Sequence, residues 1–406
     1  MVATPALSGR PGFTADLQGH TRSAYSPLPS IIAAGLAAVL HTAHLVDLAA
    51  PLVPTLTAKL TASLLTALAV ACAFVVARRR LSPAMAAAVA IGFGLGTNLW
   101  AIASQTLWQT ETVVAALTAT TVCLAVPAAS LTTAGLWAAS LSLGLAGAAR
   151  PQLAPMVAVL GLSIAVRRRR ASDVVALLPV TLVAITAILF NIHWFGHALG
   201  ATPTLESLHE TVHGLRGSWG NPLAGAAGLL LSPSRGLLVF SPIVLVSLAG
   251  LRTIAREPWS GDLRWWGLAA LAQFALYTNY SVWWGGHTYG PRYSLDILPL
   301  LVPIAAAGLP WIVGRRWSRT LAAAALAWSL LIAGTGAFVY PYDGWNVSPS
   351  NVDQNHGRLW DWSDPQFVRC WRAGWSPSNF NLFNTAGFSK PGPPAAGPAT
   401  PFAPTR

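Results

Sequence analysis

Glycine, aromatic and arginine residues gather in the segment WWGGHTYGPRY, residues 283–293, which lies between two apolar runs. Glycine lets the backbone approach a ligand closely, and the planar guanidinium of Arg292 can bind a phosphate through two N–H groups. The alternative is a belt of aromatic side chains at a membrane interface, with Arg292 extending to water. The tryptophans fit the belt better, whereas Arg292 favours a ligand because positive charge is least expected on the outer face of a membrane protein.

Two further arginines are candidates for binding an anion on the same side. Arg235, in SPSRGLLVFSP, precedes an apolar run that could begin a helix, and helix N-termini carry partial positive charge and free N–H groups. Arg150 lies in the short turn ARPQ between two apolar runs. An interfacial arginine at an ordinary helix start explains Arg235 equally well.

Glu111, in SQTLWQTET, is the only acidic residue between Asp47 and Asp173. A carboxylate at the mouth of a membrane span can act as a base or as a polar anchor, and ionisable groups at such depth are candidates for function. Glutamate in the first turn of a helix can instead cap that helix. Both roles remain open for Glu111.

A metal site is the next possibility for the polar residues. His209 and His213 are four residues apart and could share a helical face with two acids, Glu206 and Glu210, a combination that is compatible with zinc. Surface helices often carry the same residues, so we predict no metal site and no cofactor. No G-x-S-x-G, P-loop or Rossmann glycine pattern occurs in the sequence, which argues against serine hydrolases, P-loop pumps and dinucleotide enzymes.

The chain that carries these residues has 406 residues, of which 54% are hydrophobic and only 9% are charged. Soluble domains have about a quarter charged residues, so a soluble fold is excluded and the chain is predicted to be an all-α, polytopic membrane protein. The net charge of +12 comes from 25 Lys and Arg against 13 Asp and Glu. Much of the excess lies next to apolar runs, where positive charge sets orientation, so nucleic-acid binding is not expected.

Apolar windows long enough to cross a membrane recur along the chain. A hydrocarbon core about 30 Å thick needs roughly 20 apolar residues per helix. Ten spans are predicted, near residues 57–77, 84–103, 112–129, 131–149, 151–166, 173–192, 236–251, 264–282, 294–313 and 319–338. The stretch 28–49 is also apolar but contains His41, His44 and Asp47, so we expect a helix that lies at the membrane interface.

Basic residues predict the orientation, because short loops rich in Lys and Arg stay in the cytoplasm. Four clusters mark the cytoplasmic ends of the spans: Arg78 to Arg80; Arg167 to Arg170; Arg252, Arg256 and Arg264; and Arg315, Arg316 and Arg319. The loops around 104–111, 150–152, 193–235 and 283–293 then face the other side. The N-terminus faces that side too, without a signal sequence or a preceding span, which suggests that an earlier helix is missing from the recorded start.

These assignments divide the chain into four parts. Residues 1–56 form an extracytoplasmic N-terminal segment with the interfacial helix, and residues 57–339 form the transmembrane domain with its outer loop at 193–235. Residues 340–384 form an extracytoplasmic segment rich in Trp and Asn. Residues 385–406 are dominated by Pro, Gly and Ala and are expected to be disordered.

Several blocks of sequence resemble those of a known family of membrane enzymes. The blocks are YSPLPSIIAAG, GFGLGTNLWAIASQTLWQ, SPSRGLLVFSP, WWGGHTYGPRY and NVDQNHGRLWDWSDPQFVR, which extend from about Tyr25 to Arg369. In this order they resemble bacterial glycosyltransferases of the GT-C superfamily, in the branch similar to protein mannosyltransferases and to the aminoarabinose transferases of lipid A. The resemblance implies a polyprenyl-phosphate-linked sugar as donor and membrane lipids as surroundings. It also implies transfer to an acceptor at the extracytoplasmic face of the cell membrane.

The resemblance further implies which residues would carry this reaction. It needs a carboxylate as base, cations for the lipid phosphate and aromatic side chains against the sugar. The carboxylate would come from Asp16 or Glu111, and the cations from Arg235, Arg292 and Arg150. Sugar or acceptor contacts would come from Trp108, Trp219, Trp283, Trp284, His287 and Tyr289.

The N-terminal region departs from the family. Family members have a first span followed by an outer loop with a catalytic acid, and both are absent from this sequence. The surroundings of Asp16, FTADLQGH, do not match the family's acidic motif well. We therefore expect either a truncated, weakly active transferase or a noncatalytic family member. A lipid or solute transporter or flippase is the other alternative, although the paired repeats of transporters have no counterpart in the sequence.

Overall fold

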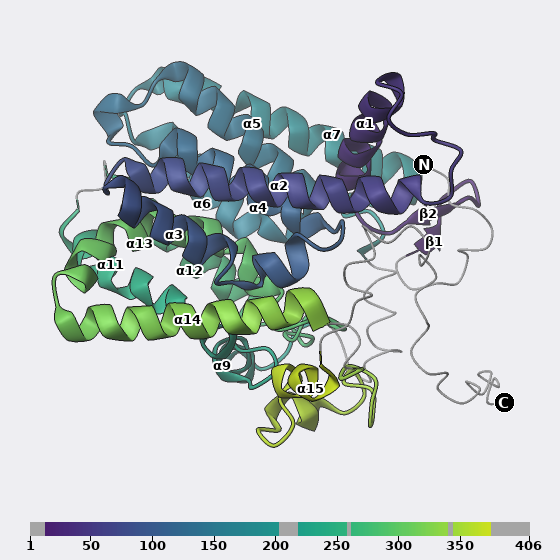
Figure 1. Ribbon diagram of the computed structural model, residues 1–406. Helices are drawn as coiled ribbons and strands as arrows, with labels where there is room; N and C mark the ends of the chain where they lie inside the picture. The colour runs from purple at the N-terminus through teal and green to yellow at the C-terminus, as the bar shows by residue number, and fades with distance from the viewer. Residues whose placement is uncertain (1–12, 203–217, 258–260, 340–343, 375–406) are drawn as a thin grey trace.

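The computed structural model describes residues 13–202, 218–257, 261–339 and 344–374 (Figure 1). Within these ranges the regular structure is helical, apart from one antiparallel hairpin that pairs Phe13 with Ser23. The elements of the first half are β1 (Phe13–Ala15), β2 (Thr21–Ser23), α1 (Leu28–Thr42), α2 (Val53–Arg78), α3 (Pro83–Gly94), η2 (Leu99–Ala103), α4 (Gln109–Leu124), η3 (Ala128–Ser130), α5 (Thr133–Ala149), η4 (Pro151–Leu153), α6 (Ala154–Val166), η5 (Ala171–Leu177) and α7 (Leu178–Phe195). The elements of the second half are α9 (Pro222–Leu231), α10 (Leu237–Phe240), η6 (Pro242–Leu245), α11 (Val246–Arg256), α12 (Leu263–Thr278), η7 (Tyr293–Asp296), α13 (Leu298–Val313), α14 (Arg316–Val339), η8 (His356–Trp360) and α15 (Gln366–Ala373).

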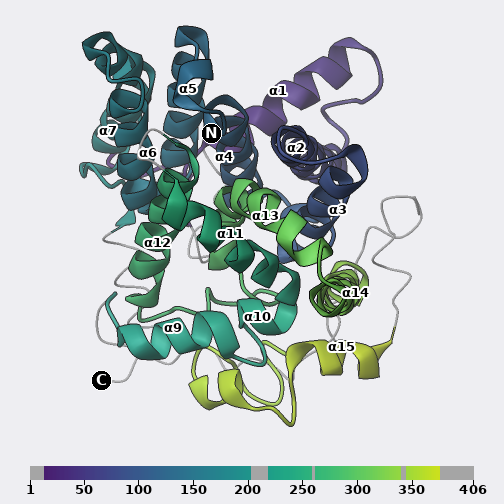
Figure 2. The same cartoon turned by 90° about the vertical axis from the view of Figure 1, so that its left-hand side faces the viewer.

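Among the described residues, three helical segments are long and apolar enough to cross a membrane. They are α2, the segment Ala171–Phe195 formed by η5 and α7, and α14. Shorter apolar helices, among them α3, α5, α6 and α13, complete the bundle, in which the axes of α2 and α14 are roughly parallel (Figures 1 and 2). The expectation of an all-α membrane protein is confirmed, whereas the number of ten spans stays a prediction.

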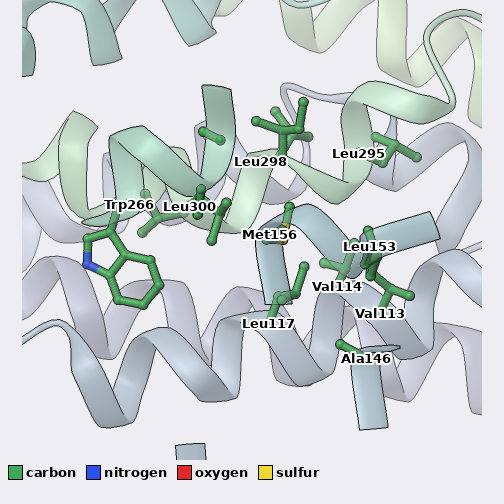
Figure 3. Close-up of a cluster of buried hydrophobic side chains, with 14 of the residues drawn as sticks. Val113, Val114, Leu117, Ala146, Leu153, Met156, Trp266, Leu295, Leu298 and Leu300 are labelled. Carbon is green, nitrogen blue, oxygen red and sulfur yellow. The ribbon is translucent and has the colours of Figure 1, made fainter. Parts of the chain in front are cut away.

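Helix α4 lies at the centre of the hydrophobic core, between α2 and α5. Val114 and Leu117 of α4 belong to the same buried cluster as Leu153 and Met156, which come from the turn into α6 and from α6 itself (Figure 3). The hydroxyl of Thr118 donates to the carbonyl of Val114 at 2.8 Å, so this polar side chain is buried with its hydrogen bond satisfied. The rigid centre fixes the start of α4, where Glu111 lies.

Two of the predicted spans are interrupted. The span expected at 84–103 leaves the α-helical form after Gly94 and continues, after a turn, as the π-helical turn η2. The span expected at 236–251 is divided into α10, η6 and α11. Pro242 has no N–H group to continue the helix and disfavours helical geometry at the residue before it. The expectation of continuous helices was wrong at these two places, because hydropathy does not register a break in backbone hydrogen bonding.

Helix α1 lies across the direction of α2 rather than along it (Figure 1). This direction suits the interfacial helix expected within 28–49, although α1 already ends at Thr42. The region expected as an outer loop, 193–235, contains the helix α9. Both α9 and the segment 344–374, with η8 and α15, lie on the same side of the bundle (Figure 2).

Three of the arginine clusters meet at one end of the bundle. Arg80 forms an ion pair with Asp262, immediately before α12, at 2.5 Å. Arg79 and Arg167 donate to carbonyls at the C-terminal end of α4, at 3.4 and 2.7 Å. We call this the basic end: the C-terminal ends of α2, α4 and α6 and the start of α12. That the basic end faces the cytoplasm stays a prediction.

Candidate functional site

Four ionisable side chains gather at the other end of α4, away from the basic end. They are Glu111 at the start of α4, Arg150 between α5 and η4, Arg292 immediately before η7 and Asp296 at the end of η7. We call these four residues the acid–arginine cluster. The sequence analysis named Glu111, Arg150 and Arg292 but missed Asp296.

Arg150 and Asp296 form a buried ion pair. Nη1 of Arg150 donates to Oδ2 of Asp296 at 2.5 Å, and the two side chains are 4% and 0% exposed. Nη2 of Arg150 donates to the hydroxyl of Thr110 at 3.0 Å, and the hydroxyl of Tyr277 donates to Oδ2 of Asp296. The pair thereby joins the start of α4, the α5–α6 turn, α12 and η7. Because Arg150 already donates hydrogen bonds to Asp296 and Thr110, the geometry does not favour the direct phosphate contact expected for Arg150.

Glu111 uses one of its two carboxyl oxygens to cap the start of α4. Its Oε1 accepts the backbone N–H of Trp108 at 2.5 Å, so the capping role that the sequence left open is present. Its Oε2 is buried and has no hydrogen-bond partner among the residues that the structure describes. Burial raises the pKa of Glu111 to about 8, although the charges of Arg150 and Arg292 act in the opposite direction. A buried oxygen of this kind is costly unless a partner arrives, and a ligand hydroxyl would be such a partner.

Arg292 lies over the ring of Trp108, with its guanidinium carbon 4.6 Å from the ring centroid. Its Nε is buried and lacks an acceptor within the described ranges. Burial lowers the pKa of Arg292, and the nearby positive charge of Arg150 lowers it further. An incoming anion would offset both effects, because it would add the opposite charge and an acceptor. The geometry therefore suits the phosphate contact that the sequence favoured.

Three tyrosines pack ring to ring beside the cluster. Tyr277 and Tyr293 stack with their centroids 4.9 Å apart, and Tyr280 meets both rings at steep angles. Trp219 contacts Tyr280 at a centroid distance of 5.9 Å and is 64% exposed. Trp108, beside Arg292, is 41% exposed. These rings connect the surface with the cluster, so two of the predicted sugar contacts, Trp108 and Trp219, lie at its rim.

Arg235 lies in a different place and has a different set of partners. Its guanidinium donates to the carbonyls of Ser234, Trp284 and Gly286 and to side-chain oxygens of Asn346 and Gln366. These bonds engage all five of the donors that an arginine has. Arg235 is completely buried and joins the 283–293 loop to the segment 344–374. The geometry is that of a structural crosslink and does not support the phosphate contact expected for Arg235.

Trp284 and His287 also contact the segment 344–374. Nε1 of Trp284 donates to Oδ1 of Asp353 at 2.8 Å, and Nε2 of His287 lies 3.2 Å from Oδ2 of the same carboxylate. Hydrogen bonds to Asp353 and Asn351 raise the pKa of His287. Trp283 is 8% exposed and packs against Trp360. These three predicted sugar contacts therefore attach the segment 344–374 to the bundle.

Tyr289 is completely buried, and its hydroxyl donates to the carbonyl of Ile332 in α14 at 2.8 Å. Its ring meets Phe240 edge to face at 5.3 Å. The structure thus places Tyr289 in the core between α10 and α14 rather than beside the acid–arginine cluster.

Asp16 lies in the turn of the N-terminal hairpin, and its oxygens serve that turn. Oδ1 accepts the backbone N–H groups of Gln18 and His20 at 2.8 and 2.9 Å, and Oδ2 accepts Nε of Arg22 at 2.5 Å. Burial acts to raise the pKa of Asp16, but these hydrogen bonds and the charge of Arg22 outweigh it and lower the pKa to about 2. A carboxylate with so low a pKa is a weak base at neutral pH. The geometry gives Asp16 a local structural role instead.

The remaining histidine and glutamate candidates, His209, His213, Glu206 and Glu210, lie outside the described residues. Among the residues that are described, no group of three His, Cys, Asp or Glu side chains is arranged to hold a metal ion.

Asp296 had a signal in the sequence that was overlooked. It is the only acidic residue between Asp262 and Asp343, and it stands at the start of a strongly apolar run. Its partner Arg150 could not be found in the same way, because 146 positions separate the two residues. The tyrosines offered a weaker signal, since aromatic residues are common at membrane interfaces.

Comparison with known proteins yields one match. No family model matches the sequence, and no curated protein does. Among solved structures, the crystal structure of ArnT from Cupriavidus metallidurans in the apo state is similar, with 15% sequence identity and a TM-score of 0.45. The match covers 83% of this chain and 58% of that chain, so this chain spans less than two thirds of the length of ArnT. At this level the likeness identifies neither a shared activity nor shared site residues.

Proposed function

We propose that the chain is a membrane glycosyltransferase that takes its sugar from a lipid-linked phosphate, with the acid–arginine cluster as its reaction site. One observation carries the proposal. Oε2 of Glu111 and Nε of Arg292 are both buried, both lack a partner among the described residues, and both belong to side chains that touch Trp108. The site thus offers an acceptor and a donor, both on residues that contact the exposed Trp108, to a ligand that carries a hydroxyl and an anion.

In the proposed reaction each residue of the acid–arginine cluster has a separate role. The acceptor hydroxyl attacks the anomeric carbon of the sugar, a new C–O bond forms, and the bond from that carbon to the phosphate oxygen breaks. Glu111 takes the hydroxyl proton on Oε2, and the lipid phosphate leaves with the electron pair of the broken bond beside Arg292. Asp296 and Arg150 pair with each other and fix the position of η7, and thereby that of Arg292, which directly precedes it.

The donor in this proposal is a polyprenyl-phosphate-linked sugar, and the reaction takes place at the membrane face opposite to the basic end. Trp108 and Trp219 would pack against the sugar, since both are exposed near the cluster. The proposal assigns no ligand contact to Arg235, Tyr289 or Asp16, because the hydrogen bonds of these residues serve the fold.

Donor use tests the proposal. The full chain is placed in lipid vesicles and incubated with a radiolabelled polyprenyl-phosphate sugar and candidate acceptors. We expect Arg292→Ala to weaken donor use by about tenfold or more, because hydrogen bonds to charged groups contribute about 1.5–3 kcal/mol. Arg316→Ala, at the exposed start of α14, is the control and should leave donor use unchanged. Equal effects of the two substitutions would rule out Arg292 as the phosphate ligand.

A lipid transporter is the second candidate, and the interruption between α10 and α11 favours it. Transporters commonly bind substrate where a helix is broken. The hydroxyl of Ser241, at this break, is buried and has no partner among the described residues. Movement of the labelled lipid across the vesicle membrane without sugar transfer would favour this candidate over the transferase.

A further inference from the structure

An apolar groove of about 190 Å³ lies between α3, α13 and α14, with η6 and α11 as its floor. Three polar residues line it, Thr97, Ser247 and Arg319. The hydroxyl of Thr97 donates to the carbonyl of Phe93 at 2.6 Å, and that of Ser247 donates to the carbonyl of Val244 at 2.6 Å. Because both hydroxyl protons are donated to nearby backbone carbonyls, the groove suits a hydrocarbon, with Arg319 as its single charged lining residue.

The groove follows α13 along its whole length, from Leu298 to Val313. At 1.5 Å per residue this stretch is about 22 Å long. One leaflet of a membrane has a hydrocarbon thickness of about 15 Å, half of the usual core. The groove is therefore long enough to take one extended acyl chain of a membrane lipid.

Positive charge and tryptophan gather where the groove ends, at the connection between α13 and α14. Arg319 is exposed there. The guanidinium carbons of Arg252 and Arg315 lie 3.9 and 4.0 Å from the ring centroid of Trp311. Trp317 is 82% exposed, as is typical of a tryptophan at the boundary between lipid tails and headgroups. A lipid chain in the groove would thus place its headgroup phosphate beside arginines.

We propose that this groove binds an anionic glycerophospholipid, with one acyl chain along α13 and the headgroup phosphate at Arg319. Burial of the acyl chain contributes binding free energy through apolar contact, and Arg319 favours an anionic headgroup. None of the four residues of the acid–arginine cluster lines the groove, and the headgroup end of the groove, at Arg319, lies at the opposite end of α13 from η7. The proposal therefore does not depend on the reaction assigned to that cluster.

Lipid binding by the detergent-solubilised full chain tests the proposal. Binding is measured by native mass spectrometry with phosphatidylglycerol and with zwitterionic phosphatidylcholine of the same acyl chains. We expect phosphatidylglycerol to bind more tightly, because the choline cation of phosphatidylcholine offsets its phosphate charge. Arg319→Gln should weaken phosphatidylglycerol binding about tenfold and phosphatidylcholine binding less. Arg316→Gln removes an exposed charge from the same helix outside the groove and should change neither lipid.

A pair of neighbouring alanines in α14 tests the groove itself. Ala323 lines the groove, whereas Ala324 does not, and both are exposed. Ala323→Phe should fill the groove and lower the occupancy of both lipids, while Ala324→Phe should not. Equal binding of the two lipids by the unaltered chain, or phosphatidylglycerol binding that survives both Arg319→Gln and Ala323→Phe, would overturn the proposal. Displacement of phosphatidylglycerol by a polyprenyl phosphate at lower concentration would overturn it too, because the groove would then belong to that lipid.

Discussion

Arg150 and Asp296 show how two buried charges can be tolerated near the end of a membrane bundle. Each charge alone would be expensive to remove from water, and Thr110 and Tyr277 add one hydrogen bond each to the pair. Oδ1 of Asp296 is buried and has no partner among the described residues. The pair fixes the position of η7, which directly follows Arg292 in the chain.

Breaking this pair should destabilise the protein strongly. Asp296→Asn leaves the guanidinium of Arg150 buried without its counter-charge, and loss of one partner of a buried pair typically costs about 3–5 kcal/mol. We expect a clear fall in the melting temperature of the purified chain. The double variant Arg150→Met with Asp296→Leu should recover a large part of the loss, because no isolated charge remains. If Asp296→Asn melts like the unaltered chain, the pair does not hold the cluster together.

At the scale of elements, hydropathy predicts where apolar helices occur but not how they are joined. The spans expected near 57–77 and 319–338 correspond to the continuous helices α2 and α14. The breaks after Gly94 and before Pro242 were missed, because apolar composition continues across them. Glu111 and Arg292 could be named in advance from charge in an apolar setting. The structural roles of Arg235 and Tyr289 could not be predicted, because their hydrogen-bond partners lie far away along the chain.

The attachment of the 283–293 loop to the segment 344–374 should depend on pH. His287 belongs to this loop, and its hydrogen bond to Asp353 raises the pKa of His287 above the ordinary value of 6.5. The protonated form of His287 therefore favours the folded contact. This stabilisation is present below about pH 6.5 and is lost as the pH rises through the raised pKa. We expect His287→Gln to reduce the difference between the melting temperatures at pH 6 and pH 8.5. The control is His193→Gln, which replaces an exposed histidine of α7 and should leave that difference unchanged. An equal change in both variants would show that His287 is not the cause of the pH dependence.

At the scale of the whole molecule, the chain places its arginine-rich connections and its acid–arginine cluster at opposite ends of α4. The basic end holds the carbonyls at the C-terminus of α4, where cations are favoured by the helix dipole. Glu111 lies at the N-terminus of the same helix, where the dipole favours an anion. This polarity underlies the prediction that the two ends face opposite sides of the membrane.

Labelling from outside the cell tests that orientation. Single cysteines replace Trp219, Trp362 and, at the basic end, Arg170, in a chain whose natural cysteines are replaced by alanine. Trp219 and Trp362 are 64% and 63% exposed, and Arg170 is exposed as well. A maleimide that does not cross membranes should label positions 219 and 362 in intact cells, and position 170 only after permeabilisation. The reverse pattern would invert the orientation and move the proposed reaction to the cytoplasmic face.

The turnover number of a Glu111→Gln variant tests the proposed transfer reaction most directly. Glutamine preserves the shape of the side chain and an oxygen for the Trp108 N–H, but it cannot accept the proton of an attacking hydroxyl. With saturating polyprenyl-phosphate sugar, we predict that kcat falls by about 10²–10⁴-fold while the KM for the donor changes little. Asp16→Asn, measured per folded molecule, should retain its kcat because Asp16 serves the N-terminal hairpin. A Glu111→Gln chain that transfers sugar at the unaltered rate would contradict the account.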